Sequence, residues 1–121
     1  MLTIDKVKKA EHLLKDVIRK TDLIFAPDLA KNSEIYLKSE NLQKTGSFKV
    51  RGAYAKIARL SDEQKKKGII ACSAGNHAQG VALAAQKNGI QSKIFIPSTA
   101  PISKIEATKS YGAQICLVDG V

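Results

Sequence analysis

Apolar residues recur at helical spacing near the start of the chain, with charged residues between them. They are Ile4, Val7, Ala10, Leu13, Leu14, Val17 and Ile18, and Thr3 precedes them as a possible N-cap. Residues that share one face of a helix repeat in this way, so the pattern predicts an amphipathic helix over residues 4–20. A loop over 22–33 and a short strand over 34–38 are expected to follow.

Helix and strand patterns then alternate to the end of the chain. Ser47 is suited to cap a helix over 48–59, and Ser61 has capping-box spacing to Gln64 for a short helix closed by Gly68. Further strands are predicted over 69–72, 92–96 and 114–118, and further helices over 77–87 and 101–110. This order predicts the α/β class, with a parallel sheet of right-handed crossovers and helices on both faces.

Composition narrows the possible partners. The 121 residues carry 20 basic and 11 acidic side chains and a net charge of +9, which raises the possibility of a nucleic-acid-binding module. The lysines are spread along the chain, however, and Trp is absent, so no stacking platform or recognition helix is visible and no nucleic-acid partner is expected. No segment is apolar enough to span a membrane, which predicts a soluble, cytoplasmic protein.

The two cysteines do not suggest a metal site. Cys72 and Cys116 both lie in apolar, strand-like runs, and the two histidines are far from them in sequence. Because a structural zinc site usually needs four ligands, we expect no metal and predict buried, reduced thiols. The sequence leaves a disulfide between the two cysteines open.

The segment Ser73-Ala-Gly-Asn-His77 follows a predicted strand and opens a helix. In parallel α/β sheets, ligands bind outside the carboxyl ends of the strands, where helix N-termini present free N–H groups. Gly75 allows close approach of a ligand, while Ser73 and Asn76 add hydrogen-bonding side chains. The segment is therefore suited to hold a carboxylate or phosphate, although a turn of small residues also occurs simply as a helix cap.

Lys49 lies in the first turn of the predicted helix over 48–59. The helix dipole disfavours a cation there, Arg51 and Lys56 add like charge, and Phe48 and Val50 would shield the amine from water. These effects favour a neutral amine, which is a nucleophile toward an aldehyde. A lysine that merely extends from a helix edge into solvent is the simpler alternative, and position does not decide between the two.

Two motifs together resemble a known family. The segments LKSENLQKTGSFKVRGA (37–53) and CSAGNHAQGVALAA (72–85) are similar to those of the fold-type-II pyridoxal-phosphate enzymes, whose fold is tryptophan synthase β-like. The resemblance is to the branch of threonine and serine dehydratases and serine racemases, and it continues through STAPISKIEATKSYGA (98–113). It implies pyridoxal 5′-phosphate as cofactor, an amino-acid substrate and a homo-oligomer.

The resemblance covers only the N-terminal part of a family member, so an incomplete fold is expected. Residues 1–52 would begin the larger, cofactor-binding domain, and residues 53–121 would form most of a smaller, mobile domain. The glycine-rich phosphate loop, the group that faces the pyridine nitrogen and any cation site would lie beyond Val121. The 121-residue chain alone is therefore expected to be inactive.

Carried over residue by residue, the resemblance implies a role for each motif position. Lys49 would hold the cofactor as a Schiff base and later move the α-proton of the substrate. Phe48 would pack against the pyridine ring, and Asn76 would donate a hydrogen bond to the 3′-oxygen of the cofactor. The substrate carboxylate would bind at the turn formed by Ser73, Ala74, Gly75, Asn76 and His77.

The implied reaction is that of the threonine ammonia-lyases, which convert L-threonine into 2-oxobutanoate and ammonia, with L-serine as a possible second substrate. The racemase branch usually has a hydroxyl at the position of Ala74, and its absence here favours elimination over racemisation. Cysteine synthase relatives fit less well, because their turn usually has Thr where this chain has His77. A serine racemase, a serine dehydratase and a non-catalytic truncated fold unit remain as alternatives.

Overall fold

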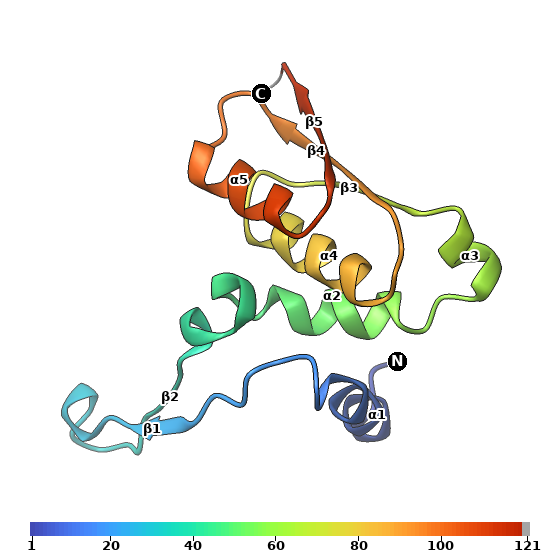
Figure 1. Cartoon of the computed structure of the whole chain (residues 1–121). Helices are drawn as coiled ribbons and strands as arrows, with labels where there is room; N and C mark the ends of the chain where they lie inside the picture. Colours follow the sequence, from blue (N-terminus) through green and yellow to red (C-terminus); the bar gives the residue numbers. More distant parts are fainter. Residues whose placement is uncertain (120–121) are drawn as a thin grey trace.

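The computed structural model describes residues 1–119, which form two parts, one above the other in Figure 1. The first part contains helix α1 (Ile4–Leu14) and a ribbon of strands β1 (Leu23–Phe25) and β2 (Tyr36–Lys38). Three short 3-10 helices accompany it: η1 (Pro27–Leu29), η2 (Glu40–Leu42) and η3 (Lys44–Gly46). Helix α2 (Lys49–Ile57) leads from this part into the second, an α/β layer structure.

Helix α1 begins as predicted but ends earlier. The Thr3 hydroxyl accepts a hydrogen bond from the N–H of Lys6 at 3.4 Å, which confirms the N-cap. The predicted extension to residue 20 is wrong, because the backbone of Arg19 is bound elsewhere. Its N–H donates to the side-chain oxygen of Gln43 at 2.7 Å, and its carbonyl accepts from the side-chain amide of Gln43 at 2.6 Å. The backbone of Arg19 thus bonds to the side chain of Gln43, a residue distant in sequence, and not to the backbone of a helical turn.

The predicted strand over 34–38 exists as β2, but it does not belong to the parallel sheet. It pairs antiparallel with β1, with Leu23 opposite Lys38 and Phe25 opposite Tyr36. The prediction of a loop over 22–33 is therefore wrong at β1. All three side chains of each strand are exposed, so neither strand shows the apolar and polar alternation that marks a half-buried strand.

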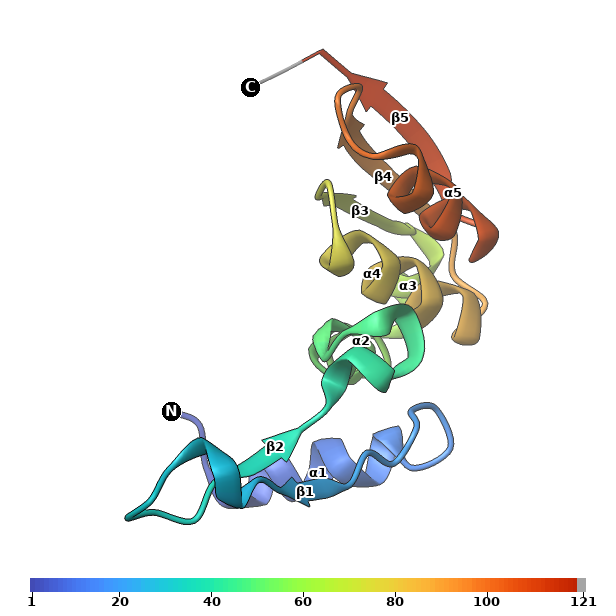
Figure 2. The same ribbon diagram turned by 90° about the vertical axis from the view of Figure 1, so that its left-hand side faces the viewer.

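The parallel sheet is confirmed for the remaining strands. It has the order β3 (Ile69–Cys72), β4 (Ser92–Pro97) and β5 (Gln114–Val118), and both neighbouring pairs are parallel. Helices α4 (Asn76–Lys87) and α5 (Ile102–Ser110) make the crossovers, while α3 (Asp62–Lys66) precedes β3. Helices were predicted on both faces of the sheet; within residues 1–119, α4 and α5 cover the same face (Figure 2).

The local signals around these elements explain their bounds. Ser61 and Gln64 form the predicted capping box at the start of α3, and Gly68 follows it with φ of +78°. Asn88 closes α4 by donating from its side-chain amide to the carbonyl of Ala84 at 2.8 Å. Gly89 then adopts φ of +65°, a conformation that glycine reaches without steric cost.

The apolar core lies between the sheet and α2, with α4 at its centre. The strand β4 contributes Ile94 and Ile96, which are 0% and 1% exposed, and α4 contributes mainly alanine side chains. Small side chains allow α4 to pack closely on both neighbours. No helix within residues 1–119 is long and apolar enough to cross a membrane.

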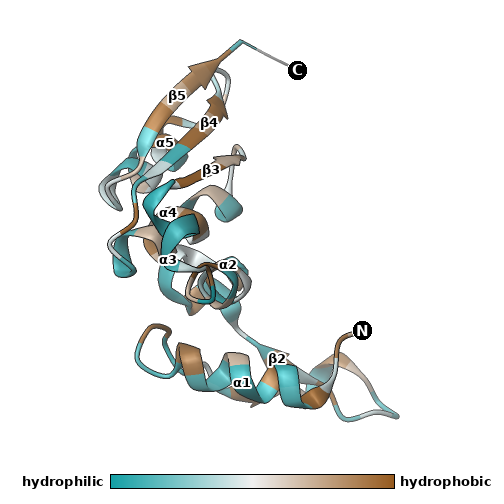
Figure 3. Cartoon of the chain, turned by 90° about the vertical axis from the view of Figure 1, so that its right-hand side faces the viewer, coloured by the Kyte–Doolittle hydropathy of each residue, from teal (hydrophilic) through white to brown (hydrophobic). Residues whose placement is uncertain are grey.

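The opposite face of the sheet carries apolar side chains that the described residues leave uncovered. Ile70 is 73% exposed, and Cys72 is exposed rather than buried as predicted. Both cysteines are free thiols, and Cys116 is half-buried. Figure 3 shows the apolar character of β4 and β5 along this sheet.

Candidate functional site

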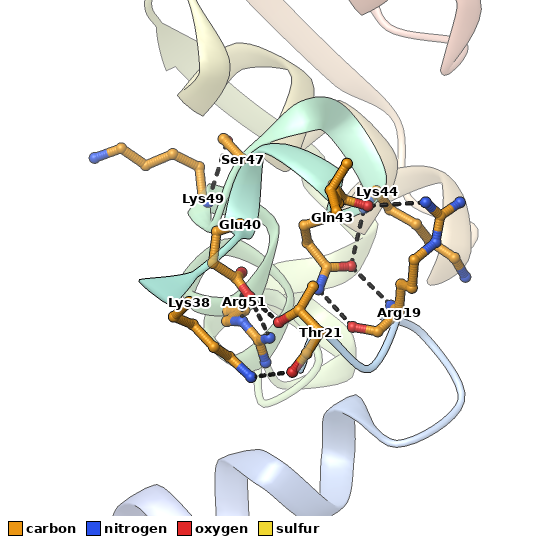
Figure 4. A network of polar contacts seen from close by, with 10 residues as sticks. Arg19, Thr21, Lys38, Glu40, Gln43, Lys44, Ser47, Lys49 and Arg51 are labelled. Carbon is orange, nitrogen blue, oxygen red and sulfur yellow. Dashed lines mark hydrogen bonds and ion pairs between the residues drawn. The ribbon is translucent and has the colours of Figure 1, made fainter. Parts of the chain in front are cut away.

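Lys49 lies at the first residue of α2, where a capped turn begins the helix. Ser47 is extended, with φ of −164° and ψ of 164°, and its hydroxyl accepts from the N–H of Lys49 at 3.3 Å. Phe48 between them already has helical dihedral angles. The bond confirms that the Ser47 hydroxyl caps the start of the helix as predicted, although Phe48 is the residue that directly precedes α2. The Lys49 side chain extends away from this turn (Figure 4).

The Lys49 side chain is exposed and points away from the neighbouring polar network (Figure 4). Its Nζ atom lies 5.0 Å from the ring centre of Phe48, which is itself 57% exposed. The prediction that Phe48 shields the amine is therefore wrong within residues 1–119. The amine forms no hydrogen bond or ion pair in that part of the chain, so it is free to react with a ligand.

The turn before Ser47 stores backbone strain. Thr45 has φ of +68° and Gly46 has φ of +66°, and only the glycine adopts this left-handed region without cost. For a threonine the cost is about 1–3 kcal/mol. The Thr45 hydroxyl is also buried and has no hydrogen-bond partner among the described residues. Strain of this kind often accompanies functional sites, here four residues before Lys49.

A partly buried polar network holds α2 against the N-terminal part (Figure 4). The guanidinium of Arg51 donates two hydrogen bonds to the carboxylate of Glu40, from Nε at 2.8 Å and from Nη2 at 2.7 Å. The Thr21 hydroxyl donates to the same carboxylate at 2.6 Å. The sequence analysis did not identify this network, because residues 21, 40 and 51 belong to separate segments that only folding brings together.

The network shifts the pKa values of its carboxylate and its guanidinium. The hydrogen bond from Arg51 lowers the pKa of Glu40 to about 2 from its usual 4.5, and the bond from Thr21 adds to this effect while burial opposes it. The carboxylate of Glu40 in turn raises the pKa of Arg51. Both groups are therefore charged near neutral pH, and the pair ties the helix that carries Lys49 to the preceding segment.

The predicted anion-binding turn connects β3 to α4. The N–H of Ser73 donates to the carbonyl of Phe95 on the neighbouring strand at 3.1 Å, and the Ser73 hydroxyl accepts from the N–H of Gly75 at 3.2 Å. Asn76 is the first residue of the helix, while Ala74 and His77 are exposed. The first N–H groups of a helix have no partner within it, so they are available to a ligand at this turn.

Lys104 joins this turn from α5, and the sequence analysis did not identify it. Its Nζ atom donates a hydrogen bond to the side-chain oxygen of Asn76 at 2.8 Å, in a half-buried position. The contact places the first turn of α5 beside the first turn of α4. Nothing in the spacing of residues 76 and 104 predicts it, because it depends on the packing of two helices.

A close backbone approach connects Lys49 to the same helix. A Cβ atom added at Gly80 of α4 would lie 3.0 Å from the carbonyl carbon of Lys49 and 3.1 Å from the nitrogen of Val50. Only glycine leaves room for α2 at this distance. Helices α2 and α4 run side by side and begin at the same end (Figure 1), so Gly80 sets the spacing between Lys49 and the Ser73–His77 turn.

The N-termini of α2, α4 and α5 all lie at the end of the molecule that carries Lys49 and the Ser73–His77 turn (Figure 2). None of the three helices has an acidic residue in its first turn, whereas α1 has Asp5 and α3 has Asp62 and Glu63. An acid normally stabilises a helix N-terminus, and lysines occupy the first turns of α2 and α5 instead. The site is thus electropositive and suited to an anionic ligand.

The donors of the site suit an anionic organic ligand better than a metal ion. Within residues 1–119 there is no group of three or more His, Cys, Asp or Glu side chains that could hold a metal. The free groups are an amine at Lys49, the amide of Asn76 and backbone N–H groups, all of which donate hydrogen bonds or react as nucleophiles.

Comparisons with known proteins show what this chain is similar to. The family model described as "Pyridoxal-phosphate dependent enzyme" matches residues 14–121. The L-threonine ammonia-lyase of Thermotoga maritima is 56% identical over 119 residues, which are 97% of this chain and 30% of that protein. The chain therefore spans about a third of the length of the curated relatives it matches.

Solved structures share the same arrangement. Maize serine racemase superimposes with a TM-score of 0.90 at 39% identity, over 98% of this chain and 36% of that one. The processed form of threonine deaminase isoform 2 from Solanum lycopersicum superimposes with a TM-score of 0.82 at 36% identity, over 99% and 37% of the two chains. Their folds confirm the predicted fold class.

Proposed function

The chain belongs to the family of pyridoxal-phosphate-dependent enzymes, and on that premise we propose that it provides the reactive lysine and the substrate-binding turn of an L-threonine ammonia-lyase. The identity to L-threonine ammonia-lyase supports the substrate. The observation that carries the proposal is the contact at Gly80, which holds the backbone of Lys49 against the helix that begins with the Ser73–His77 turn.

The residues present fit the cofactor. Lys49 offers an amine that has no hydrogen-bond or ion-pair partner within residues 1–119, and the amide nitrogen of Asn76 can donate because its oxygen already accepts from Lys104. We propose that Lys49 holds the cofactor, that Asn76 donates to its 3′-oxygen and that the exposed ring of Phe48 packs against its pyridine ring. When bound, pyridoxal phosphate serves as an electron sink for the carbanion at the substrate α-carbon.

The protein residues then have defined tasks in the reaction. The backbone N–H groups of the Ser73–His77 turn bind and orient the substrate carboxylate. The freed Nζ atom of Lys49 removes the α-proton as a general base, and the β-hydroxyl leaves with a proton as water. The enamine that remains tautomerises to an imine, and hydrolysis of this imine consumes one water, so L-threonine yields 2-oxobutanoate and ammonia.

The proposal is tested by identifying the lysine that carries the cofactor. The complete protein is incubated with pyridoxal phosphate, reduced with borohydride and mapped by peptide mass. We expect the label on Lys49, and Lys49→Ala should lose the label and lower the rate of keto-acid formation by at least a thousandfold. Label on Lys44 or Lys56 instead would refute the assignment.

A racemase is the second candidate, because maize serine racemase has a very similar fold. Ala74 bears on this choice, since it is exposed at the turn and has no hydroxyl to return a proton to the far face of the substrate. We expect the complete protein to eliminate much faster than it racemises, and Ala74→Ser to raise the racemisation share. Chiral chromatography of serine recovered after partial turnover measures both, and D-serine formed as fast as pyruvate by the unmodified protein would favour the racemase.

We also propose that residues 1–52 belong to the larger cofactor domain and residues 53–121 to a smaller domain that moves over the site. All buried residues of the main apolar core lie at or beyond Ala53, which supports a division near that residue, and α2 continues across it as one helix. The cytoplasmic location and the homo-oligomer stay predictions.

A further inference from the structure

The hydrogen bond between Lys104 and Asn76 determines which way the Asn76 amide faces. An ammonium group has three donors and no acceptor, so it can only approach the oxygen of the amide. The Nζ atom of Lys104 lies 2.8 Å from that oxygen. The NH₂ group of Asn76 is thereby left for a different partner, and that partner has to be a hydrogen-bond acceptor.

The position of Lys104 is costly for α5 itself. It lies in the first turn of the helix, where the dipole disfavours a positive charge, and that turn contains no acid to balance it. A neutral amide oxygen compensates a cation only in part. The arrangement becomes favourable when an anionic oxygen binds beside Asn76, because the Lys104 charge then has an anion nearby.

We propose that Lys104 is a positioning residue: it fixes Asn76 with its NH₂ group toward the ligand and selects an acceptor oxygen that carries negative charge. The inference rests on the proposed function, in which that oxygen is the 3′-oxygen of the cofactor. Without Lys104 the side-chain amide of Asn76 can adopt either of two flipped orientations. In one of them its oxygen faces the 3′-oxygen of the cofactor, and two acceptor oxygens form no hydrogen bond. The bound cofactor then loses a hydrogen bond and a nearby positive charge.

The test uses the complete protein with three substitutions in α5 and, as a background, Asn76→Ala in α4. Lys104→Met removes the charge and keeps the length of the side chain, Lys104→Arg keeps a donor, and Lys109→Met removes an exposed lysine from the last turn of the same helix. Cofactor affinity is measured by equilibrium dialysis, and the absorption spectrum of the bound cofactor is recorded at one pH. Separately, the side-chain amide signals of Asn76 are followed by NMR in cofactor-free protein with ¹⁵N-labelled asparagine.

We expect Lys104→Met to weaken cofactor binding about tenfold and to change the ratio of the absorption bands, with Lys104→Arg recovering most of the loss and Lys109→Met behaving like the unmodified protein. In the background of Asn76→Ala, Lys104→Met should have less than a threefold further effect. The Asn76 amide signals should shift in Lys104→Met alone.

Two results would overturn the inference. The first is that Lys104→Met has the same cofactor affinity and the same Asn76 amide signals as Lys109→Met. The second is that the losses of cofactor affinity caused by Lys104→Met and Asn76→Ala are fully additive. Failure of the proposed function looks different. In that case the unmodified protein carries no label on Lys49 after borohydride reduction, while a shift of the Asn76 signals in Lys104→Met still supports the orienting role of Lys104.

Discussion

The two parts of the molecule are held together in different ways. The part from Ala53 onward is organised around a continuous apolar core, in which Ile94 and Ile96 are almost completely buried. The part before α2 has no such core among the described residues. Its ribbon exposes Ile24 and Phe25, and its firm contacts are hydrogen bonds among Arg19, Gln43, Glu40, Thr21 and Arg51.

This difference indicates where rigidity comes from at the site. Burial of apolar surface is not directional, so it makes the second part compact through the close packing of many side chains and not through any one oriented contact. The polar network is directional, and it acts on α2 through Arg51, two residues after Lys49. Lys49, which we propose to be the reactive lysine, therefore lies where the polar network meets the apolar core, and both restrict the position of its backbone.

The strongest contrast should appear in core truncations. Ile94→Ala is expected to lower the free energy of unfolding by about 3–4 kcal/mol, because it leaves a cavity at a fully buried position. Ile24→Ala removes the same atoms from a side chain that is 50% exposed and should cost less than about 1 kcal/mol. Urea unfolding of the complete protein measures both. Equal losses in the free energy of unfolding for Ile94→Ala and Ile24→Ala would contradict the difference between the two parts, because they would show that another segment covers the β1–β2 ribbon.

The polar network should be sensitive to acid. The pKa of Glu40 is lowered from 4.5 to about 2 in the folded protein, so the carboxylate stabilises the fold above pH 4.5 and loses this contribution as the pH falls toward 2. This lowering of the pKa corresponds to at most about 3 kcal/mol, and screening by solvent around the partly exposed pair reduces that contribution.

Glu40→Gln should therefore be less stable than the unmodified protein at pH 6, and the difference should shrink at pH 3. Urea midpoints at the two pH values give this comparison. Glu34→Gln, at an exposed carboxylate that forms no hydrogen bond within residues 1–119, provides the matched control. A gap for Glu40→Gln that stays constant with pH would show that the carboxylate does not stabilise the N-terminal part.

A smaller loss of stability than for Ile94→Ala or Glu40→Gln is expected at the contact between α2 and α4. Gly80→Ala places a methyl group 3.0–3.2 Å from the backbone of Lys49 and Val50, so α2 must shift by a few tenths of an ångström. We expect a loss of about 1 kcal/mol in stability, together with a fall in turnover of at least tenfold because Lys49 is displaced.

Gly52→Ala is the matched control for this substitution, since no atom lies within 4 Å of a Cβ added there. It should be neutral or stabilise α2 by up to about 1 kcal/mol, and it should leave cofactor affinity unchanged. Equal turnover for Gly80→Ala and the unmodified protein would show that the spacing of α2 and α4 does not control the site.

The sequence predicts the second part of the chain much better than the first. Local signals such as the Ser61 capping box and Asn88-Gly89 act within a few residues, and so the bounds of α3 and α4 agree with prediction. The strand β1 gave no such signal, because its three residues are all apolar and do not alternate with polar residues. The contacts of Lys104 with Asn76 and of Arg51 with Glu40 join distant segments, which no local pattern can reveal.

The approach of α2 to Gly80 also bears on how the protein can change during evolution. At Gly80 the approach of these helices is limited by backbone atoms, which are the same in every amino acid, while side chains such as Ile57 and Val81 pack in the core farther along the two helices. Exchanges among those side chains that keep their size can therefore accumulate without moving the lysine that we propose to be reactive. Gly80 itself tolerates almost no other residue, because any Cβ atom there would push α2 away. Core positions can therefore vary in sequence while the position of Lys49 depends on one requirement, the absence of a side chain at residue 80.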